Sequence, residues 1–187
     1  MRDRTATLID NFASLSALGD FSLAPDGHSI AFTRQVGQHR QIFAMPTERA
    51  WANRITATLD DCSEPQWSPD GQHLVFVREH ALWIANADGS SARELTNHPA
   101  GNTNPRWSPD GTRIAFLSRR RGWSHVWTIS ASENRPTQIT QGDFDVVNPT
   151  WSSDGKWLAY DSWRAEDIQT RGVYLIPSTG GEEQLIS

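Results

Sequence analysis

The chain has 187 residues, enough for one domain with a substantial hydrophobic core. Its formal net charge at pH 7 is −5 and charges of both signs are mixed along its length, so no basic surface for nucleic acid or an acidic membrane is expected. Cys62 is the only cysteine, which excludes an internal disulfide. No apolar run has the length of a secretory signal or a membrane span, so we expect a soluble, cytoplasmic protein.

Residues 1–17 differ in pattern from the rest of the chain. Their larger apolar side chains, Leu8, Ile9, Phe12 and Leu15, are spaced as on one face of a helix. We therefore expect an N-terminal arm with a short helix, followed from residue 18 by β-structure.

One turn-and-strand sequence then recurs four times. The copies are "FSLAPDGHSIAFTR" from Phe21, "PQWSPDGQHLVFVR" from Pro65, "PRWSPDGTRIAFLS" from Pro105 and "PTWSSDGKWLAYDS" from Pro149. Proline presets φ for a tight turn, aspartate bonds to nearby backbone amides, and glycine supplies the left-handed corner. Gly111 should therefore need a positive φ, and its substitution by alanine should destabilise the protein. The same substitution at Gly122, which lies in a loop of variable length, should cost less stability.

The turns separate strands that also recur at fixed intervals. A first strand precedes each turn, and the second strands carry the triplets Ile30–Phe32, Leu74–Phe76, Ile114–Phe116 and Leu158–Tyr160. Third strands contain Phe43, Trp83, Trp127 and Tyr174, and fourth strands contain Ile55, Leu95, Ile139 and Leu185. Only the link from the second to the third strand varies in length.

Four antiparallel strands in each repeat predict an all-β protein, a β-propeller with four blades at about residues 18–57, 62–97, 103–141 and 147–187. An immunoglobulin-like sandwich would not repeat its own sequence, and a helical solenoid would show a 3.6-residue apolar period. The bulky Trp67, Trp107 and Trp151 suit wedges between blades and do not suit the tight circle of a closed four-bladed ring. We therefore predict an incomplete, open propeller whose bare apolar end faces permit self-association.

These motifs resemble the WD-like repeat of TolB and of the propeller domains of prolyl-oligopeptidase-family serine peptidases, which include dipeptidyl and acylaminoacyl peptidases. The resemblance covers about residues 18–187, with departures at Leu23, Ala24 and Ser153. It implies a non-catalytic propeller that lies over a hydrolase domain, limits substrate access and contacts peptide substrate or that domain. The short N-terminal arm favours this branch, and the alternative is a stand-alone TolB-like module that binds protein partners.

Catalytic motifs are missing from the sequence. It contains no G-x-S-x-G nucleophile elbow, no H-E-x-x-H and no glycine-rich phosphate loop, so no catalytic, metal or cofactor site is expected and the chain is not expected to be an enzyme by itself. An enzyme with a site in the propeller channel is a third reading, which no acid–base constellation supports. Glu182 and Glu183 resemble the glutamate pair that binds the substrate amino terminus in dipeptidyl peptidases, but they lack its inserted helical segment, so that role is not assigned to them.

The variable links between second and third strands are the candidate recognition loops. The third repeat places Arg119, Arg120, Arg121 and Trp123 there, and the fourth places Trp163, Arg164 and Arg171. Arginine beside tryptophan suits contact with a peptide carboxylate or an aromatic side chain.

We predict that purified residues 1–187 hydrolyse neither aminoacyl nor dipeptidyl chromogenic substrates, because no nucleophile–base pair is recognisable. Absorbance assays with increasing protein concentration test this directly. Turnover that survives purification and is abolished by a serine-directed phosphonate would contradict it.

Overall fold

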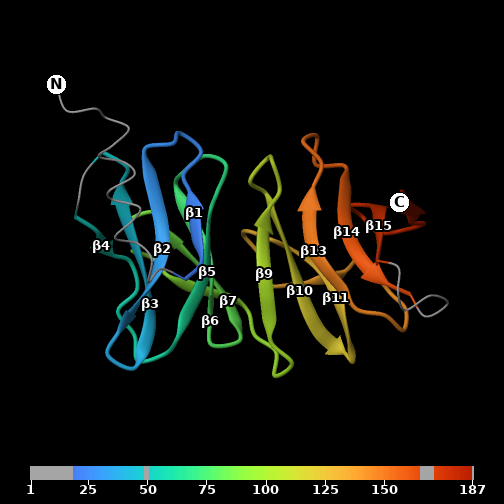
Figure 1. Ribbon diagram of the computed structural model, residues 1–187, viewed down its shortest axis with the longest axis horizontal. Coiled ribbons are helices and arrows are strands. Elements are labelled where there is room, and N and C mark those ends of the chain that lie inside the picture. The colour runs from blue at the N-terminus through green and yellow to red at the C-terminus, as the bar shows by residue number, and fades with distance from the viewer. Residues whose placement is uncertain (1–18, 49–50, 165–170, 187) are drawn as a thin grey trace.

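The computed structural model describes residues 19–48, 51–164 and 171–186, which form β-strands joined by turns (Figure 1). The first sheet contains β1 (Phe21–Leu23), β2 (Ser29–Val36), β3 (His39–Pro46) and β4 (Asn53–Arg54). The second contains β5 (Cys62–Trp67), β6 (His73–Arg78), β7 (Ala81–Asn86) and β8 (Arg93–Thr96). The third contains β9 (Asn102–Trp107), β10 (Arg113–Arg121), β11 (Trp123–Ser130) and β12 (Thr137–Gln138). The fourth contains β13 (Val146–Trp151), β14 (Trp157–Trp163), β15 (Arg171–Pro177) and β16 (Gln184–Leu185).

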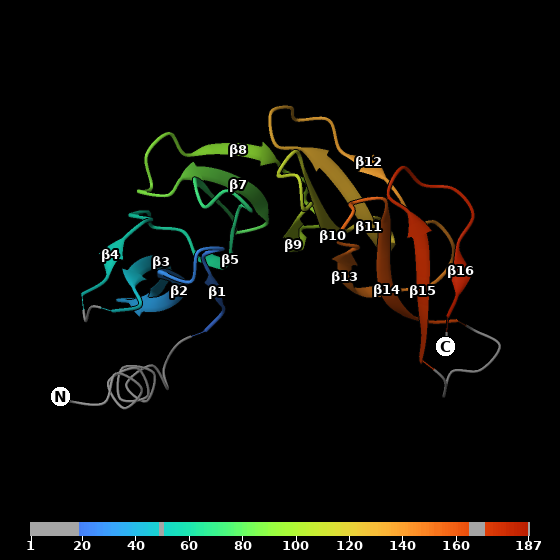
Figure 2. The ribbon, with the colours of Figure 1, turned by 90° about the horizontal axis from the view of Figure 1, so that it is seen from above.

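Each sheet is an antiparallel meander whose strands are hydrogen-bonded in sequence order. Seen from above, the four sheets follow one another along an arc, with β1, β5, β9 and β13 on its concave side (Figure 2). Sheets that are neighbours in sequence pack together, whereas no extensive contact joins the first sheet to the fourth within the described ranges. The predicted fold class, an open propeller of four-stranded blades, is confirmed, and the predicted N-terminal helix lies outside the described residues.

The repeated turn has the local chemistry that its sequence indicates. In the third blade, the Ser108 hydroxyl donates to Asp110 Oδ1 over 2.6 Å, and the Thr112 amide donates to the same oxygen over 3.1 Å. The Ser108 hydroxyl is also the main cause of the lowered pKa of the Asp110 carboxyl. Gly111 has φ 69°, and its N–H donates to the Ser108 carbonyl over 2.9 Å, which closes the turn.

Neighbouring sheets pack face to face, with aliphatic side chains of one blade against aromatic and aliphatic side chains of the next. Val75 and Val77 of the second sheet share a buried cluster with Ile114 and Phe116 of the third. Truncating such a buried aromatic to alanine typically costs about 3–5 kcal/mol of folding free energy. The core of this protein therefore lies between the sheets, in one layer at each junction.

Two of the three predicted tryptophan wedges, Trp107 and Trp151, link neighbouring blades by hydrogen bonds. The Trp107 indole N–H donates to the Gln66 carbonyl of the preceding sheet over 3.1 Å, and Trp151 donates in the same way to Arg106 over 3.0 Å. Each indole therefore fills the gap between two blades and fixes their separation at the inner edge.

The outer face of the fourth sheet carries one charged side chain beside the apolar Ala159, Val173 and Leu175. Asp161 pairs with Val173 on the face opposite to Tyr160, where the second and third sheets have Val77 and Leu117. The Asp161 carboxylate forms an ion pair with Arg171 and accepts from Asn148 Nδ2 over 2.9 Å. A charged group at this position reduces the drive for apolar association, and self-association stays a prediction.

Gly122 has φ 98°, a conformation that favours glycine, and the smaller cost expected for alanine at Gly122 than at Gly111 stays a prediction. Among the described residues, no helix has both the length and the apolar character that crossing a bilayer requires.

We predict that Gly111→Ala lowers the free energy of unfolding by about 1 kcal/mol or more, because alanine is strained at φ 69°. Gly111→Asn is the matched control and should lose less, since asparagine tolerates the left-handed region. Urea denaturation followed by tryptophan fluorescence measures both. Equal midpoints for the two variants would mean that the backbone conformation does not limit this turn.

Candidate functional site

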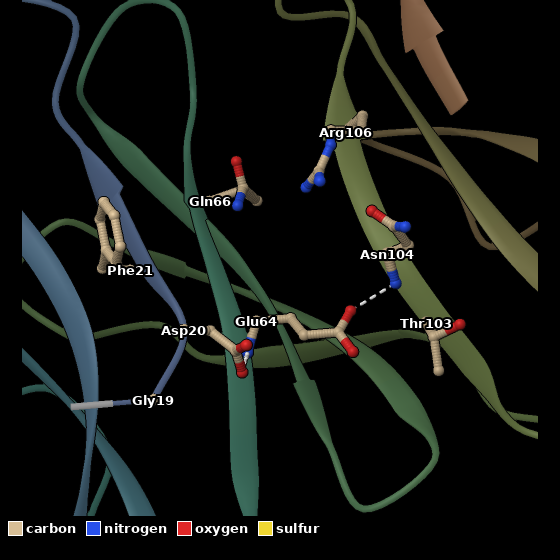
Figure 3. A pocket seen from close by; sticks show the side chains of 8 residues that line it. All are labelled: Gly19, Asp20, Phe21, Glu64, Gln66, Thr103, Asn104 and Arg106. Atoms are coloured by element: carbon tan, nitrogen blue, oxygen red, sulfur yellow. Dashed lines mark hydrogen bonds between the residues drawn. The ribbon is translucent and has the colours of Figure 1, made fainter. Parts of the chain in front are cut away.

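A polar cavity of about 670 Å³ opens on the concave side of the arc (Figure 3). It lies across the inner strands of the first three blades. Its polar lining comes from Asp20 beside β1, from Glu64 and Gln66 on β5, and from Thr103, Asn104 and Arg106 on β9. The junctions between blades are therefore apolar, whereas the concave side of the arc carries side chains that form hydrogen bonds.

Backbone bulges place Glu64 and Asn104 at the cavity, and the fourth blade has an equivalent bulge at Asn148. Glu64, Asn104 and Asn148 have φ values of 54°, 57° and 52°, and each directly precedes a proline. At each position the inner strand shifts register against its neighbour, so that Glu64 and Pro65 together stand opposite one residue, Phe76. A left-handed conformation costs a non-glycine residue of the order of 1–3 kcal/mol, and such strain is concentrated at functional sites.

Carboxylate oxygens of the preceding blade accept the backbone N–H at two of these bulges. Asp20 Oδ2 accepts the Glu64 N–H over 3.1 Å, and Glu64 Oε2 accepts the Asn104 N–H. The bond from Glu64 to Asn104 is visible in Figure 3. Each acidic side chain therefore fixes the strained backbone of the next blade with one oxygen and leaves its second oxygen for the cavity.

The charges in the cavity are unequal. Burial is the main cause of the raised pKa of Glu64, and the Asp20 carboxylate raises it further, while the Asn104 N–H and the Arg106 guanidinium oppose the shift. Arg106 donates to the carbonyl of its neighbour Pro105 over 3.1 Å and forms no ion pair within the described residues. Two carboxylates and one unpaired guanidinium therefore face the same space.

This arrangement is suited to binding and offers no recognisable nucleophile. Carboxylates, amides, a hydroxyl and a guanidinium together match the donors and acceptors of a peptide main chain. Across residues 19–48, 51–164 and 171–186, no three His, Cys, Asp or Glu side chains are grouped as metal ligands. The Cys62 thiol is buried, and burial raises its pKa, which disfavours the reactive thiolate.

The predicted recognition residues of the third blade lie at a hairpin and have different surroundings. Arg119 has an exposed side chain and an ion pair with Asp145 at 3.1 Å, while Arg121 is exposed and Trp123 is 44% exposed. Arg120 turns inward: its guanidinium lies over the Trp127 ring at 5.1 Å and donates to the Thr96 hydroxyl. Arg120 therefore joins the second and third blades, and burial lowers its pKa.

The fourth blade divides its three predicted residues in the same way. Trp163 is 42% exposed and lies beneath the exposed Arg171 guanidinium, 5.0 Å from its ring centre. Arg164 packs 3.8 Å from the ring centre of Tyr174 and forms an ion pair with Glu183. Glu183 also accepts the Tyr160 hydroxyl, so this glutamate fastens the end of the blade. The role of the exposed residues in recognition stays a prediction.

The residues of the cavity were not predicted from the sequence. Asp20, Glu64, Asn104 and Asn148 recur at the same intervals as the turn aspartates, and three of them precede proline. A comparison of the four repeats at this position would have found a polar side chain in each copy. Only the structure reveals the positive φ of Glu64, Asn104 and Asn148, and the place of Asp20, Glu64 and Asn104 at the cavity.

Comparisons with known proteins agree with the geometry. The family described as "TolB beta propeller domain" matches residues 62–187. A curated protein described as "Uncharacterized peptidase YuxL", from Bacillus subtilis (strain 168), is 29% identical over 103 residues, which are 49% of this chain and 16% of that protein.

Two solved structures are similar in fold. A putative TolB from Agrobacterium tumefaciens has a TM-score of 0.74 at 23% identity, covering 90% of this chain and 64% of that one. A puromycin-hydrolyzing peptidase from Mycobacterium tuberculosis has a TM-score of 0.64 at 16% identity, covering 90% of this chain and 37% of that one. The chain thus spans less than two thirds of the length of each of these proteins.

We predict that Glu64→Gln stabilises the protein near neutral pH. The folded pKa of Glu64 is raised, so its contribution to stability is full below the unfolded pKa and is lost as the pH rises through the folded pKa. Glutamine keeps an acceptor for the Asn104 N–H but carries no charge. Urea midpoints of the two proteins should differ at pH 7.5 and converge towards pH 4.5.

The control for this prediction is Glu64→Ala, which removes both the charge and the acceptor. It should be less stable than Glu64→Gln at every pH. A difference between wild type and Glu64→Gln that does not change with pH would contradict the burial of this carboxylate.

Proposed function

Because the chain belongs to the TolB β-propeller domain family, we propose that it is the non-catalytic propeller portion of a prolyl-oligopeptidase-type serine peptidase. In this role it limits which substrates reach the hydrolase domain and contacts the peptide or that domain. The curated relative described as a peptidase supports this branch of the family. The similarity in fold to a puromycin-hydrolyzing peptidase supports it as well.

The observation that carries the proposal is the polar cavity on the concave side. A peptide that enters along the inner strands meets carboxylates at Asp20 and Glu64 and a guanidinium at Arg106. These groups bind main-chain amides and carbonyls without any catalytic chemistry of their own. Such a surface selects peptides by size and charge, while cleavage takes place in another domain.

A second function is favoured by the TolB resemblance. The match of the TolB propeller family to residues 62–187 and the TM-score of 0.74 with a putative TolB suit a stand-alone module that binds protein partners. On this reading, the hairpins with Trp123 and Trp163 are the contact surface. A cytoplasmic location is a proposal under either function.

The complete reading frame that contains residues 1–187 tests the proposal. We predict that its product reacts with a fluorophosphonate probe at a serine in a G-x-S-x-G motif and cleaves peptidyl chromogenic substrates. Arg106→Ala in that product should lower kcat/KM for longer peptides more than for single aminoacyl substrates, because only longer peptides reach the inner strands.

A reading frame without a nucleophile elbow, whose product is not labelled by the probe, would overturn the peptidase proposal and favour the TolB-like module. The Arg106→Lys variant is the matched control. Retention of the positive charge should preserve much of the preference for longer peptides.

A further inference from the structure

At the end of the sheets that carries the Asp-Gly turns, a notch separates each pair of neighbouring blades. The notch between the third and fourth blades is filled by the Arg113 side chain. Its guanidinium lies 4.8 Å from the centre of the Trp151 ring. It donates to the Ser178 carbonyl over 3.1 Å, to the Ser178 hydroxyl over 3.0 Å and to the Gly155 carbonyl over 3.3 Å.

The other two notches have the same construction because the blades repeat. The indole of Trp67 or Trp107 takes the place of Trp151, and the turn residue Gly71 or Gly111 takes the place of Gly155. Ala87 and Ala131 occupy the position of Ser178, as their equivalent amide bonds back to the turn confirm. Each notch therefore presents an aromatic floor beside backbone carbonyls.

The notch between the second and third blades also contains an arginine side chain of this protein. Arg93 lines this notch and donates to the Ala131 carbonyl, which is equivalent to the Ser178 carbonyl. Two different strands thus bring a guanidinium to the same kind of acceptor. Carbonyl oxygens beside an indole ring are a favourable environment for this group.

The notch between the first and second blades has no such group. The positions of Arg113 and Arg93 are taken here by the short side chains of Ser29 and Asn53, and a cavity of about 430 Å³ remains. Asp26 and Asp88 stand at its rim, and the described residues that line it include no lysine or arginine. Negative charge and carbonyl acceptors are therefore present without the guanidinium that binds the equivalent carbonyl in the other two notches. The notch that contains Arg93 also keeps a cavity, of about 540 Å³, so the distinguishing feature of the first notch is the absence of a cation among its described lining residues.

We propose that this first notch is a docking site for an arginine side chain of a bound polypeptide, held over Trp67 as Arg113 is held over Trp151. A lysine is a poorer match, because an ammonium lacks the planar fork of donors that reaches two carbonyls and stacks on an indole. Such a site serves a peptidase propeller and a TolB-like module equally, so it does not depend on the proposed function.

The probe is the peptide acetyl-Gly-Arg-Gly-amide, titrated into ¹⁵N-labelled protein and followed by NMR. Resonances of the Trp67 indole and of the Gly71 and Ala87 amides should shift. The isosteric citrulline peptide lacks the charge, so its affinity should be lower by a factor of about ten or more. Equal shifts with both peptides would overturn the proposal.

Two substitutions exploit the repeat. Ser29→Arg should place a guanidinium in the first notch and so raise the unfolding midpoint. It should also weaken binding of the arginine peptide by a factor of about ten or more. The control variant, Ser29→Ala, should bind the peptide as the wild type does. The Ser29 hydroxyl makes no side-chain hydrogen bond among the described residues, so neither change removes one.

Arg113→Ser is the converse test and remains informative even if Ser29→Arg fails to fold. It empties the notch between the third and fourth blades, so the arginine peptide should now also shift the Gly155 and Ser178 amides. An Arg113→Ser protein that is folded but shows no new binding at these residues would contradict the assignment of the notch as an arginine site.

Discussion

The fold depends on one constraint: a four-stranded sheet with apolar side chains on both faces is stable only between two neighbours. The second and third sheets meet this condition. At the junction between them, Val75 and Val77 of the second sheet pack on Ile114 and Phe116 of the third. The next junction repeats the arrangement with Leu117 against Leu158. Because each contact uses the same positions, the spacing of the repeat is also the spacing of the blades.

The chemistry of the molecule varies where this packing leaves freedom. At the inner strands, equivalent positions hold Asp20, Glu64, Asn104 and Asn148, so charge changes from blade to blade along the concave side. At the turn end, Ser29, His73 and Arg113 occupy equivalent positions, and of these three it is Arg113 that fills its notch. A constant framework with variable inner and rim positions is what a binding module requires, and both proposed sites lie at such positions.

The sequence was sufficient for those features that local chemistry determines. The Ser-Pro-Asp-Gly turns and the strands after them were predictable, because proline, aspartate and glycine each restrict the backbone directly. The left-handed bulges at Glu64 and Asn104 were not, because their backbone N–H groups donate to a carboxylate of the preceding blade, which lies far away in the sequence. Arg120 and Arg164 illustrate the same limit: their aromatic partners, Trp127 and Tyr174, lie on other strands.

The central claim is that these blades form an open arc, and a distance measurement tests it most directly. His28, Gln72 and Lys156 are exposed and equivalent in the first, second and fourth blades. Spin labels can be attached to cysteines at these positions in a Cys62→Ala background. Pulsed electron paramagnetic resonance then measures the distance between the labels at positions 28 and 72 and between those at positions 28 and 156. The open arc predicts a much longer separation for 28/156 than for 28/72. Equal separations would contradict it, because the first and fourth blades of a closed four-bladed ring are neighbours.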